Sequence, residues 1–327
     1  MEERFRAVLH VRDSVALTLA DLRESETELN LDHETSCGFM MTRNNAPIAL
    51  IKAAAERKVL PFLGAGFSKN ISTDMPSWRQ LIERAAGRLK YDASILQAQA
   101  DQYQIAEYLH LKNELSSFYR ELDDALHDGR HRVQDSRVHE ALCRLDAEFV
   151  FTTNWDNWIE KAFDYYHFPY QKINDVDHLI NPVVGPPKVS PTASKRKFMS
   201  TTIVKFHGDF DDPASLVFRE TDYHNRLDFR NPLDIKLQAE AIRHSVLFIG
   251  YSFTDKNTRY IWHRLRQERE AVGKSRRPAS FFVTFSDNTL QRELFAAMDI
   301  ETIVLDPDDS ANNLEALFEE LLKAQRS

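Results

Sequence analysis

Cysteine is nearly absent from this chain, which has only Cys37 and Cys143 among its 327 residues. Two cysteines cannot supply the four thiolates of a structural zinc site, and they cannot form a disulfide framework. Long apolar runs are also lacking, since none reaches the roughly 20 residues that a membrane-spanning helix needs. The first residues do not contain the apolar stretch of a signal peptide either. We therefore expect a cytoplasmic protein that binds no zinc and contacts no membrane.

Basic residues are in the minority, with 42 Lys and Arg against 50 Asp and Glu and a net charge of -8. This balance disfavours broad electrostatic attraction to nucleic acid or to an anionic membrane. Two basic clusters, at residues 195–197 and 274–277, lie in stretches that contain Pro, Ser or Gly. Isolated charge runs of this kind are typical of solvated loops. Direct nucleic-acid binding is therefore not expected, and the alternative is that these clusters contact a partner or nucleic acid.

What the chain does contain is an alternation of apolar and amphipathic segments. Six segments are short, continuous and apolar, as expected of strands covered on both faces: residues 59–63, 149–151, 203–206, 246–249, 281–285 and 302–305. Helices are predicted before, between and after these strands, at residues 46–56, 78–89, 256–270, 290–298 and 314–324. The alternation predicts an α/β fold with a doubly wound, mostly parallel, Rossmann-like sheet.

The domain organisation follows from the segments that do not fit this alternation. Residues 1–45 have an acidic centre, and we interpret them as an N-terminal extension for oligomerisation or partner contact. The main domain then covers residues 46–327. The gap between the first two strands is too long for one crossover helix, so residues of about 91–145 are predicted to be a helical insertion beside the ligand crevice. Residues 181–200 are rich in Pro, Lys and Ser and are predicted to be a loop.

Four polar motifs each follow the end of a predicted strand. They are Gly-Ala-Gly-Phe-Ser at 64–68, Thr-Thr-Asn-Trp-Asp at 152–156, Phe-His-Gly-Asp at 206–209 and Gly-Tyr-Ser-Phe-Thr-Asp at 250–255. Open α/β sheets bind ligands at the carboxyl ends of their strands, so the four motifs could line one crevice. A turn that admits a pyrophosphate, an amide with a carboxylate, and a histidine together suit chemistry on a dinucleotide.

Two of these motifs also have an ordinary structural interpretation. Gly64 and Gly66 would let the backbone approach a pyrophosphate, but a plain strand-to-helix turn explains them equally well. The third glycine of the Rossmann spacing is replaced by Lys69, and the Gly-Lys-Ser/Thr of a P-loop is absent. Asn154 or Asp156 could simply cap the helix that follows.

The other two motifs leave the same choice open. His207 is the only one of twelve histidines that follows a continuous apolar strand and precedes a glycine. A lone histidine is more often structural, but this placement favours a general base near neutral pH. No metal-ligand spacing accompanies it. Gly250 and Ser252 could bring N–H groups and a hydroxyl to phosphate or ribose, or could form only a tight turn. The order of the four motifs carries the prediction.

Taken in this order, the motifs resemble those of the sirtuin superfamily. The similarity is to the zinc-free branch of bacterial sirtuin-like domains that destroy NAD in antiphage defence, and it covers roughly residues 46–320. The resemblance implies that Asn154 and Asp156 contact the ribose and the nicotinamide pocket, and that His207 is catalytic. It implies that the turn formed by Gly64, Ala65, Gly66, Phe67 and Ser68 surrounds the NAD phosphates. It also implies that Gly250 with Ser252 forms a later turn that binds phosphate or ribose.

The chain departs from the deacylating sirtuins at several positions. Those enzymes carry a zinc module with four cysteines, which this chain cannot build. Met-Pro-Ser-Trp at 75–78 stands where they have Gly-Ile-Pro-Asp-Phe-Arg. Thr153 replaces their glutamine, and Trp155 replaces a smaller aliphatic residue. These differences disfavour recognition of acyl-lysine more than they disfavour cleavage of the nicotinamide–ribose bond.

The function that the resemblance implies is NAD+ glycohydrolysis, with NAD+ as substrate and no cofactor. Asn154 would position the ribose or a water, His207 would accept a proton, and Asp156 would orient the carboxamide. The alternatives are an ADP-ribosyltransferase, a zinc-free deacylase, or a non-catalytic module that binds NAD or ADP-ribose.

A hydrolase of this kind would kill its host unless it were controlled. We expect no separate sensor domain, because the 327 residues have no obvious room for one. We therefore expect either a homo-oligomer or control by a separately encoded partner, such as a motor ATPase or an Argonaute-type protein.

Overall fold

The computed structural model describes residues 46–76, 78–185, 200–226, 230–251, 256–270 and 277–326. The predicted N-terminal extension lies outside these residues, as do the basic cluster at 195–197 and most of that at 274–277. Within the described part of the chain, no helix combines the length and the apolar character needed to cross a membrane.

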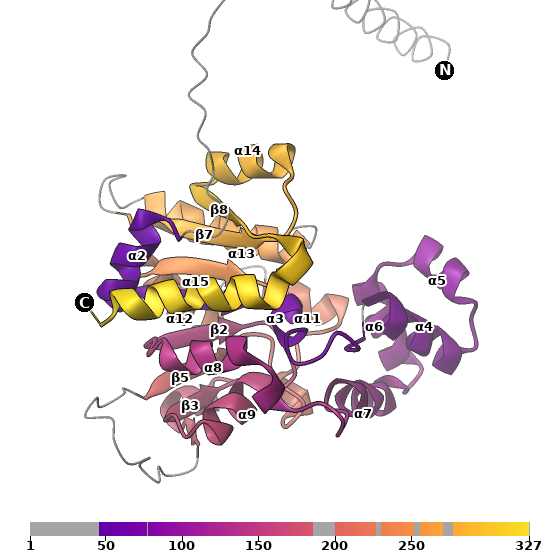
Figure 1. Cartoon of the computed structure of the whole chain (residues 1–327). Helices are drawn as coiled ribbons and strands as arrows, with labels where there is room; N and C mark the ends of the chain where they lie inside the picture. Colours follow the sequence, from indigo (N-terminus) through magenta and orange to yellow (C-terminus); the bar gives the residue numbers. More distant parts are fainter. Residues whose placement is uncertain are drawn as a thin grey trace, which may run out of the picture. The chain divides into compact units, whose positions relative to one another are not determined.

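Eight strands form one sheet in the order β4-β3-β5-β2-β1-β6-β7-β8 (Figure 1). Neighbouring strands run parallel throughout, except for the antiparallel pair β3–β4. The strands are β1 (Val59–Leu63), β2 (Phe149–Thr152), β3 (Tyr170–Ile173), β4 (Val183–Val184), β5 (Thr201–Lys205), β6 (Ser245–Ile249), β7 (Ser280–Thr284) and β8 (Ile300–Val304). The predicted α/β fold with a mostly parallel sheet is confirmed.

The central strand β1 shows why the sheet is doubly wound. Its side chains alternate between the two faces. Val59 and Leu63 belong to a buried cluster on one face, and Leu60 and Phe62 to a second cluster on the other. Helices cover both clusters (Figure 1). The first face carries α2 (Ile48–Ala55), α8 (Arg137–Arg144), α9 (Trp158–Tyr165) and α15 (Ser310–Ala324); the second carries α12 (Pro232–Arg243), α13 (Lys256–Glu270) and α14 (Thr289–Ala297).

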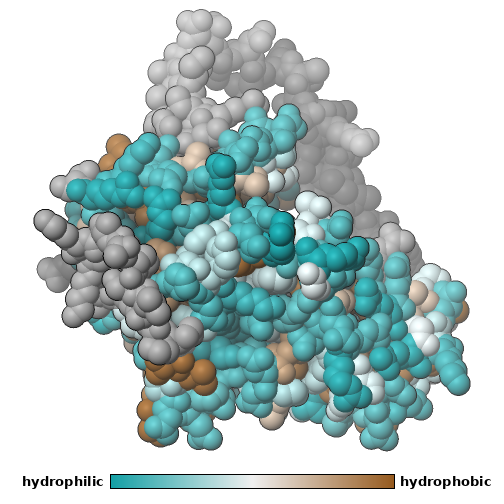
Figure 2. All heavy atoms as spheres, turned by 60° about the horizontal axis from the view of Figure 1, so that its bottom comes forward, coloured by the Kyte–Doolittle hydropathy of each residue, from teal (hydrophilic) through white to brown (hydrophobic). Residues whose placement is uncertain are grey.

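The six predicted strands are present within one or two residues, whereas β3 and β4 were not predicted. β3 is not an apolar run because it contains Lys172, which is buried and forms ion pairs with Asp209 (2.7 Å) and Asp211 (2.8 Å). β4 has only two residues and lies at the edge of the sheet. Apolar side chains are exposed there, with Ile180 at 78% and Val184 at 74%. Figure 2 brings this side of the molecule forward and shows brown patches in a mainly hydrophilic surface.

Four helices between β1 and β2 form what we call the helical lobe (Figure 1, right). They are α4 (Trp78–Leu89), α5 (Ala93–Gln99), α6 (Gln102–Leu111) and α7 (Leu115–Leu126). Apolar residues at helical spacing, such as Leu115, Phe118 and Leu122 of α7, build a third buried cluster. Phe218, from outside the lobe, completes it. The division of the chain into an extension, a catalytic domain and an insertion stays a prediction.

The remaining described elements are short. They comprise α3 (Ala65–Ser68), α10 (Asp177–Ile180), α11 (Glu220–His224) and the 3₁₀ turns at Val133–Asp135, Pro213–Ser215 and Pro307–Asp309. Two of them concern the candidate site directly: α3 carries the glycine motif, and α11 lies beside His207.

Candidate active site at the carboxyl ends of the central strands

The four predicted motifs begin at the same end of the parallel strands. Leu63 pairs in register with Thr152 on one side and with Ile249 on the other, and Thr152 pairs with Lys205. These four residues therefore form one row across β5, β2, β1 and β6, and each motif begins at or directly after its member of the row. Because the strands are parallel, all four motifs lie at their carboxyl ends, where α/β sheets bind ligands.

Asn154 is buried and fixed by three hydrogen bonds. Its side-chain Nδ2 donates to the carbonyl oxygen of Gly64 (3.0 Å) and to Oγ of Ser68 (2.9 Å), and its backbone N–H donates to Oγ1 of Thr152 (3.0 Å). A carbonyl oxygen can only accept, so the contact with Gly64 sets the orientation of the amide. Oδ1 is then the atom of Asn154 that remains for a ligand. Asn154 does not cap α9, whose N-cap residue is Asn157.

Asp156 is buried, and both of its carboxylate oxygens already accept a hydrogen bond. Oδ2 accepts from the Ser68 hydroxyl (2.8 Å), and Oδ1 accepts from the backbone N–H of Trp158 (3.2 Å), the first residue of α9. The helix-capping interpretation therefore fits the Oδ1 contact. Ser68 joins the two motifs, because its hydroxyl accepts from Asn154 and donates to Asp156.

The glycines of two motifs pack backbone against backbone. The N–H of Gly66 donates to the carbonyl oxygen of Gly250 (2.9 Å), and Gly250 has a φ of 73°, which favours glycine. A Cβ on Gly250 would lie 2.2 Å from the backbone nitrogen of Phe67, and one on Gly64 would lie 2.6 Å from the Gly250 oxygen. This close approach is a structural reason for glycine at these positions. Because the Gly66 N–H is engaged, it is not a free donor for a phosphate.

The other predicted members of these two turns differ in exposure. Phe67 is fully buried, and its ring centroid lies 4.5 Å from that of His139 on α8. Its side chain thus belongs to the core, while that of Ala65 is exposed. Ser252 lies outside the described residues.

His207 is buried among aromatic and cationic groups. Its exposed fraction is 7%, and its ring meets the ring of Tyr223 on α11 edge to face, 5.4 Å between centroids. Burial, together with the nearby Arg226 guanidinium, holds the pKa of His207 well below its usual value. The imidazole is therefore neutral at neutral pH, and one of its two ring nitrogens is a hydrogen-bond acceptor. Arg226 is held in place by the Phe206 carbonyl and the Asp234 carboxylate.

Asn154 and His207 occupy equivalent positions at neighbouring strand ends. Each lies two residues beyond a member of the pair Thr152–Lys205, which joins β2 to β5. This register supports a shared site for the amide and the imidazole.

Residues that were not predicted tie the motifs together. The Tyr251 hydroxyl donates to the carbonyl oxygen of Leu63 (3.1 Å) and lies 2.8 Å from the Thr153 hydroxyl, so the turn after β6 is joined to the turn after β2. Lys205 is fully buried and donates to the main-chain oxygen of Asp156. A lysine inside an otherwise apolar strand was the available signal for the second contact, since a buried charge requires a partner.

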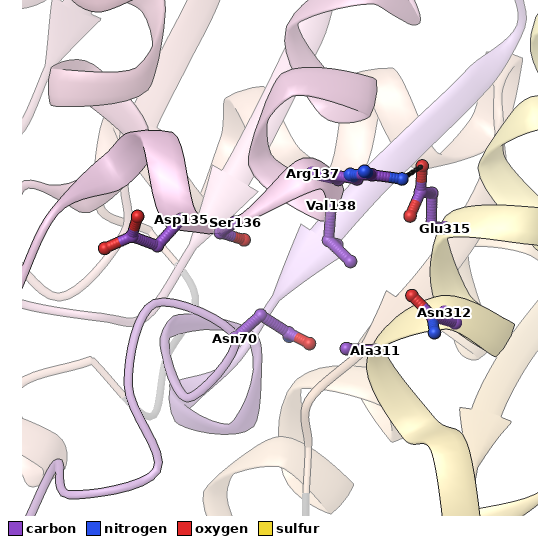
Figure 3. A pocket seen from close by; sticks show the side chains of 8 residues that line it. All are labelled: Asn70, Asp135, Ser136, Arg137, Val138, Ala311, Asn312 and Glu315. Atoms are coloured by element: carbon purple, nitrogen blue, oxygen red, sulfur yellow. Dashed lines mark ion pairs between the residues drawn. The ribbon is translucent and has the colours of Figure 1, made fainter.

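A cavity of about 410 Å³ lies elsewhere, between α8, α15 and the residues after α3 (Figure 3). Its rim includes Arg137 and Glu315, which form an ion pair at 3.7 Å, and Asn70. Asn70 donates to the carbonyl oxygen of Phe67 (2.8 Å), which links the cavity to the back of the glycine turn. None of the predicted site residues lines this cavity.

A model of the SIR2-like domain family matches residues 148–303. This span contains the motifs that carry Asn154, His207 and Gly250, while the glycine turn at 64–68 precedes it. The chain carries a SIR2-like domain.

Named relatives of the SIR2-like chain come from bacteria. It is 28% identical over 267 residues to NAD(+) hydrolase ThsA of Bacillus cereus (strain MSX-D12), covering 78% of this chain and 52% of that protein. For ThsA of Acinetobacter baumannii (strain 532279) the identity is 24%, with 85% and 55% covered. For Defense-associated sirtuin 2 of Bacillus subtilis it is 24%, with 78% and 24% covered. The chain spans about half the length of the ThsA proteins, or less.

Among solved structures, the crystal structure of a Sir2 homologue–NAD complex shares 12% identity and a TM-score of 0.44 with the SIR2-like chain, covering 86% of this chain and 96% of the other. This score lies below 0.5, and the assignment of the fold rests on the strand order and register described above.

Proposed function

We propose that this chain is an NAD+ glycohydrolase that cleaves the nicotinamide–ribose bond and yields nicotinamide and ADP-ribose. The observation that carries the proposal is the pairing of a fixed amide oxygen, Oδ1 of Asn154, with a neutral buried imidazole, His207, at neighbouring strand ends. The naming of the ThsA relatives as NAD(+) hydrolases supports the same reaction.

The reaction mainly requires that NAD+ and a water molecule be held in position. Nicotinamide leaves from a cationic nitrogen, so the bond electrons neutralise the leaving group, and the sugar passes through an oxocarbenium-like state. Water then bonds to the anomeric carbon and loses a proton. Oδ1 of Asn154 accepts a hydrogen bond from this water or from a ribose hydroxyl, and a ring nitrogen of His207 accepts the proton. Each carboxylate oxygen of Asp156 can accept one more hydrogen bond, so it can receive the nicotinamide carboxamide.

The NAD phosphates are proposed to lie against the turn at 64–68, and a phosphate or a ribose against the turn of Gly250 and Ser252. Because the Gly66 and Phe67 N–H groups bond to Gly250 and Gly64 oxygens, other backbone donors of these turns would contact the ligand.

Incubation of the purified chain with NAD+, with products separated by chromatography, tests the function. We expect nicotinamide and free ADP-ribose from the wild type, and a loss of about 100-fold or more for His207→Ala. The matched control is His244→Ala, a buried histidine that precedes β6 at the amino ends of the strands, and it should retain turnover. Full turnover by His207→Ala would remove this residue from the mechanism.

The products also separate the rival functions. Transfer of labelled ADP-ribose to protein would indicate a transferase, and O-acetyl-ADP-ribose would indicate a deacylase. Stabilisation by NAD+ without release of nicotinamide would indicate a binding module.

We further propose that the activity is gated and serves bacterial antiphage defence. The name of the Bacillus subtilis relative, Defense-associated sirtuin 2, supports a role in defence. Gating would occur through self-assembly or a separately encoded partner. Sedimentation of the full chain at rising concentration, with turnover per chain measured in parallel, tests self-assembly. If the chain sediments as a monomer at every concentration and turnover per chain stays constant, control by self-assembly is ruled out.

A further inference from the structure

The strand β5 ends in a lysine that no solvent reaches. Lys205 has no exposed surface, although the rest of β5 is uncharged. An ammonium group buried in this way is costly unless it is paired and hydrogen-bonded. An apolar residue would fill the position more simply, so the charge calls for a specific explanation.

Two groups contact the Lys205 ammonium. Nζ donates a hydrogen bond to the main-chain oxygen of Asp156, and it lies 3.4 Å from Oε1 of Glu160 on α9. Within the described residues, neither carboxylate oxygen of Glu160 has a hydrogen-bond partner. Glu160 therefore supplies charge, while the hydrogen bond of Lys205 goes to the Asp156 carbonyl.

The Asp156 carbonyl belongs to the turn that carries Asn154. From the other directions this turn is held by Ser68, which bonds to Asn154 and Asp156, and by Nε2 of His127, which accepts from the backbone N–H of Asn157 (3.0 Å). Lys205 adds a support from β5, the strand that leads into His207 two residues later. One side chain thus links the turn of the amide to the strand of the imidazole.

We propose that Lys205 is a positioning residue: its ammonium group holds the Asp156 carbonyl and thereby sets Asn154 relative to His207. The inference rests on the proposed NAD+ hydrolysis for its catalytic consequence. The structural consequence of the inference is independent of that function: the turn at 153–157 should open more often when the ammonium is removed.

The experiment compares three variants with the wild-type chain. Lys205→Met alone leaves Glu160 as an unpaired buried carboxylate and can fail to fold. Lys205→Met with Glu160→Gln removes both charges and keeps similar side-chain volumes. Glu160→Gln alone is the matched control, since it retains the contact between Lys205 and the Asp156 carbonyl. For each chain, Tm, amide hydrogen exchange of the peptide that contains residues 153–157, and kcat and KM for NAD+ are measured.

Relative to Glu160→Gln, we expect the double variant to show exchange at 153–157 that is about tenfold faster, and a kcat that is lower by roughly 10- to 100-fold with KM changed much less. Glu160→Gln itself should stay close to the wild type in both readouts, but it leaves the buried Lys205 ammonium without its counter-charge, so its Tm should be lower than that of the wild type. Exchange at 153–157 that equals the control would overturn the positioning role, whether or not the chain hydrolyses NAD+. Faster exchange at 153–157 together with an unchanged kcat would also overturn the positioning role.

The two proposals fail in different ways. If the wild type releases no nicotinamide while the double variant exchanges faster at 153–157, the proposed function is wrong and the structural role of Lys205 stands.

Discussion

The two halves of the candidate site are held by different forces. The asparagine side, which consists of Asn154, Ser68, Asp156 and Gly64, is a chain of buried hydrogen bonds. The histidine side, which consists of His207, Phe206, Tyr223 and Arg226, is held by ring packing and by one guanidinium. Within the described residues, no hydrogen bond fixes the His207 ring. Directional bonds fix an atom, whereas ring contacts tolerate small displacements.

The histidine side is also connected to the helical lobe. The ring of Tyr223 lies 4.4 Å from that of Tyr103 on α6, and the N–H of Thr221 donates to the Glu107 carboxylate (3.1 Å). A movement of the lobe would therefore reach His207 through α11, and it would reach the turn of Asn154 through His127 at the end of α7, which accepts from the Asn157 N–H. We therefore expect the asparagine side to hold its atoms rigidly and the histidine side to adjust its position.

The largest expected effect comes from reversing the hydrogen bonds of the asparagine side. Asn154→Asp places an oxygen against the Gly64 carbonyl, so two acceptors face each other and two bonds are lost. We expect a loss of about 2–4 kcal/mol in the free energy of unfolding. His207→Gln should cost only about 1 kcal/mol or less, because no ring hydrogen bond is broken. Urea unfolding measures the loss of unfolding free energy in both variants. Equal losses would show that the two sides are not held by different forces.

Acid should weaken the fold through two of the buried histidines, His139 and His207, one for each side of the site. Burial lowers the pKa of His139, which packs on Phe67, to about 3, and the pKa of His207 is lowered too. The folded state thus excludes a proton that the unfolded chain binds below a pH of about 6.5. The contribution to stability is complete above that pH and is lost as the pH falls toward the folded-state pKa.

For His139 this loss amounts to about 2–3 kcal/mol between pH 6.5 and pH 4.5. Replacement by leucine should flatten the curve of unfolding free energy against pH by this amount. An identical acid dependence in His139→Leu and the wild type would contradict the assignment.

The smallest effect concerns the link to the helical lobe. Glu107→Gln weakens the contacts with Thr221 and Arg219, so the histidine side should loosen while stability changes by less than about 1 kcal/mol. We expect a several-fold change in turnover. Glu114→Gln is the matched control, because Glu114 pairs with Arg88 inside the lobe. If both variants behave alike, α11 does not transmit movement of the lobe to His207.

The sequence predicted those features that depend on local patterns. Apolar runs located six strands, and the polar residues after them located the four motifs. β3 was not predicted because Lys172 interrupts its apolar pattern. Asp209 and Asp211 neutralise this lysine, and sequence spacing does not reveal that pairing. The same limit applies within the site. The hydrogen bonds of Asn154 to Gly64 and Ser68, and that of Lys205 to Asp156, exist only because distant strands align in one register.

The strand order also has a consequence for synthesis on the ribosome. β1 is made early, yet it lies between β2 and β6, and all five of its residues pair with β6. A nascent chain therefore keeps one edge of its first strand without a partner until residues 245–249 have emerged. The Gly250 turn that packs on Gly66 is absent for the same period. Unfinished polypeptides accordingly lack the proposed site, and premature termination upstream of β6 yields a product in which the four motifs are not assembled.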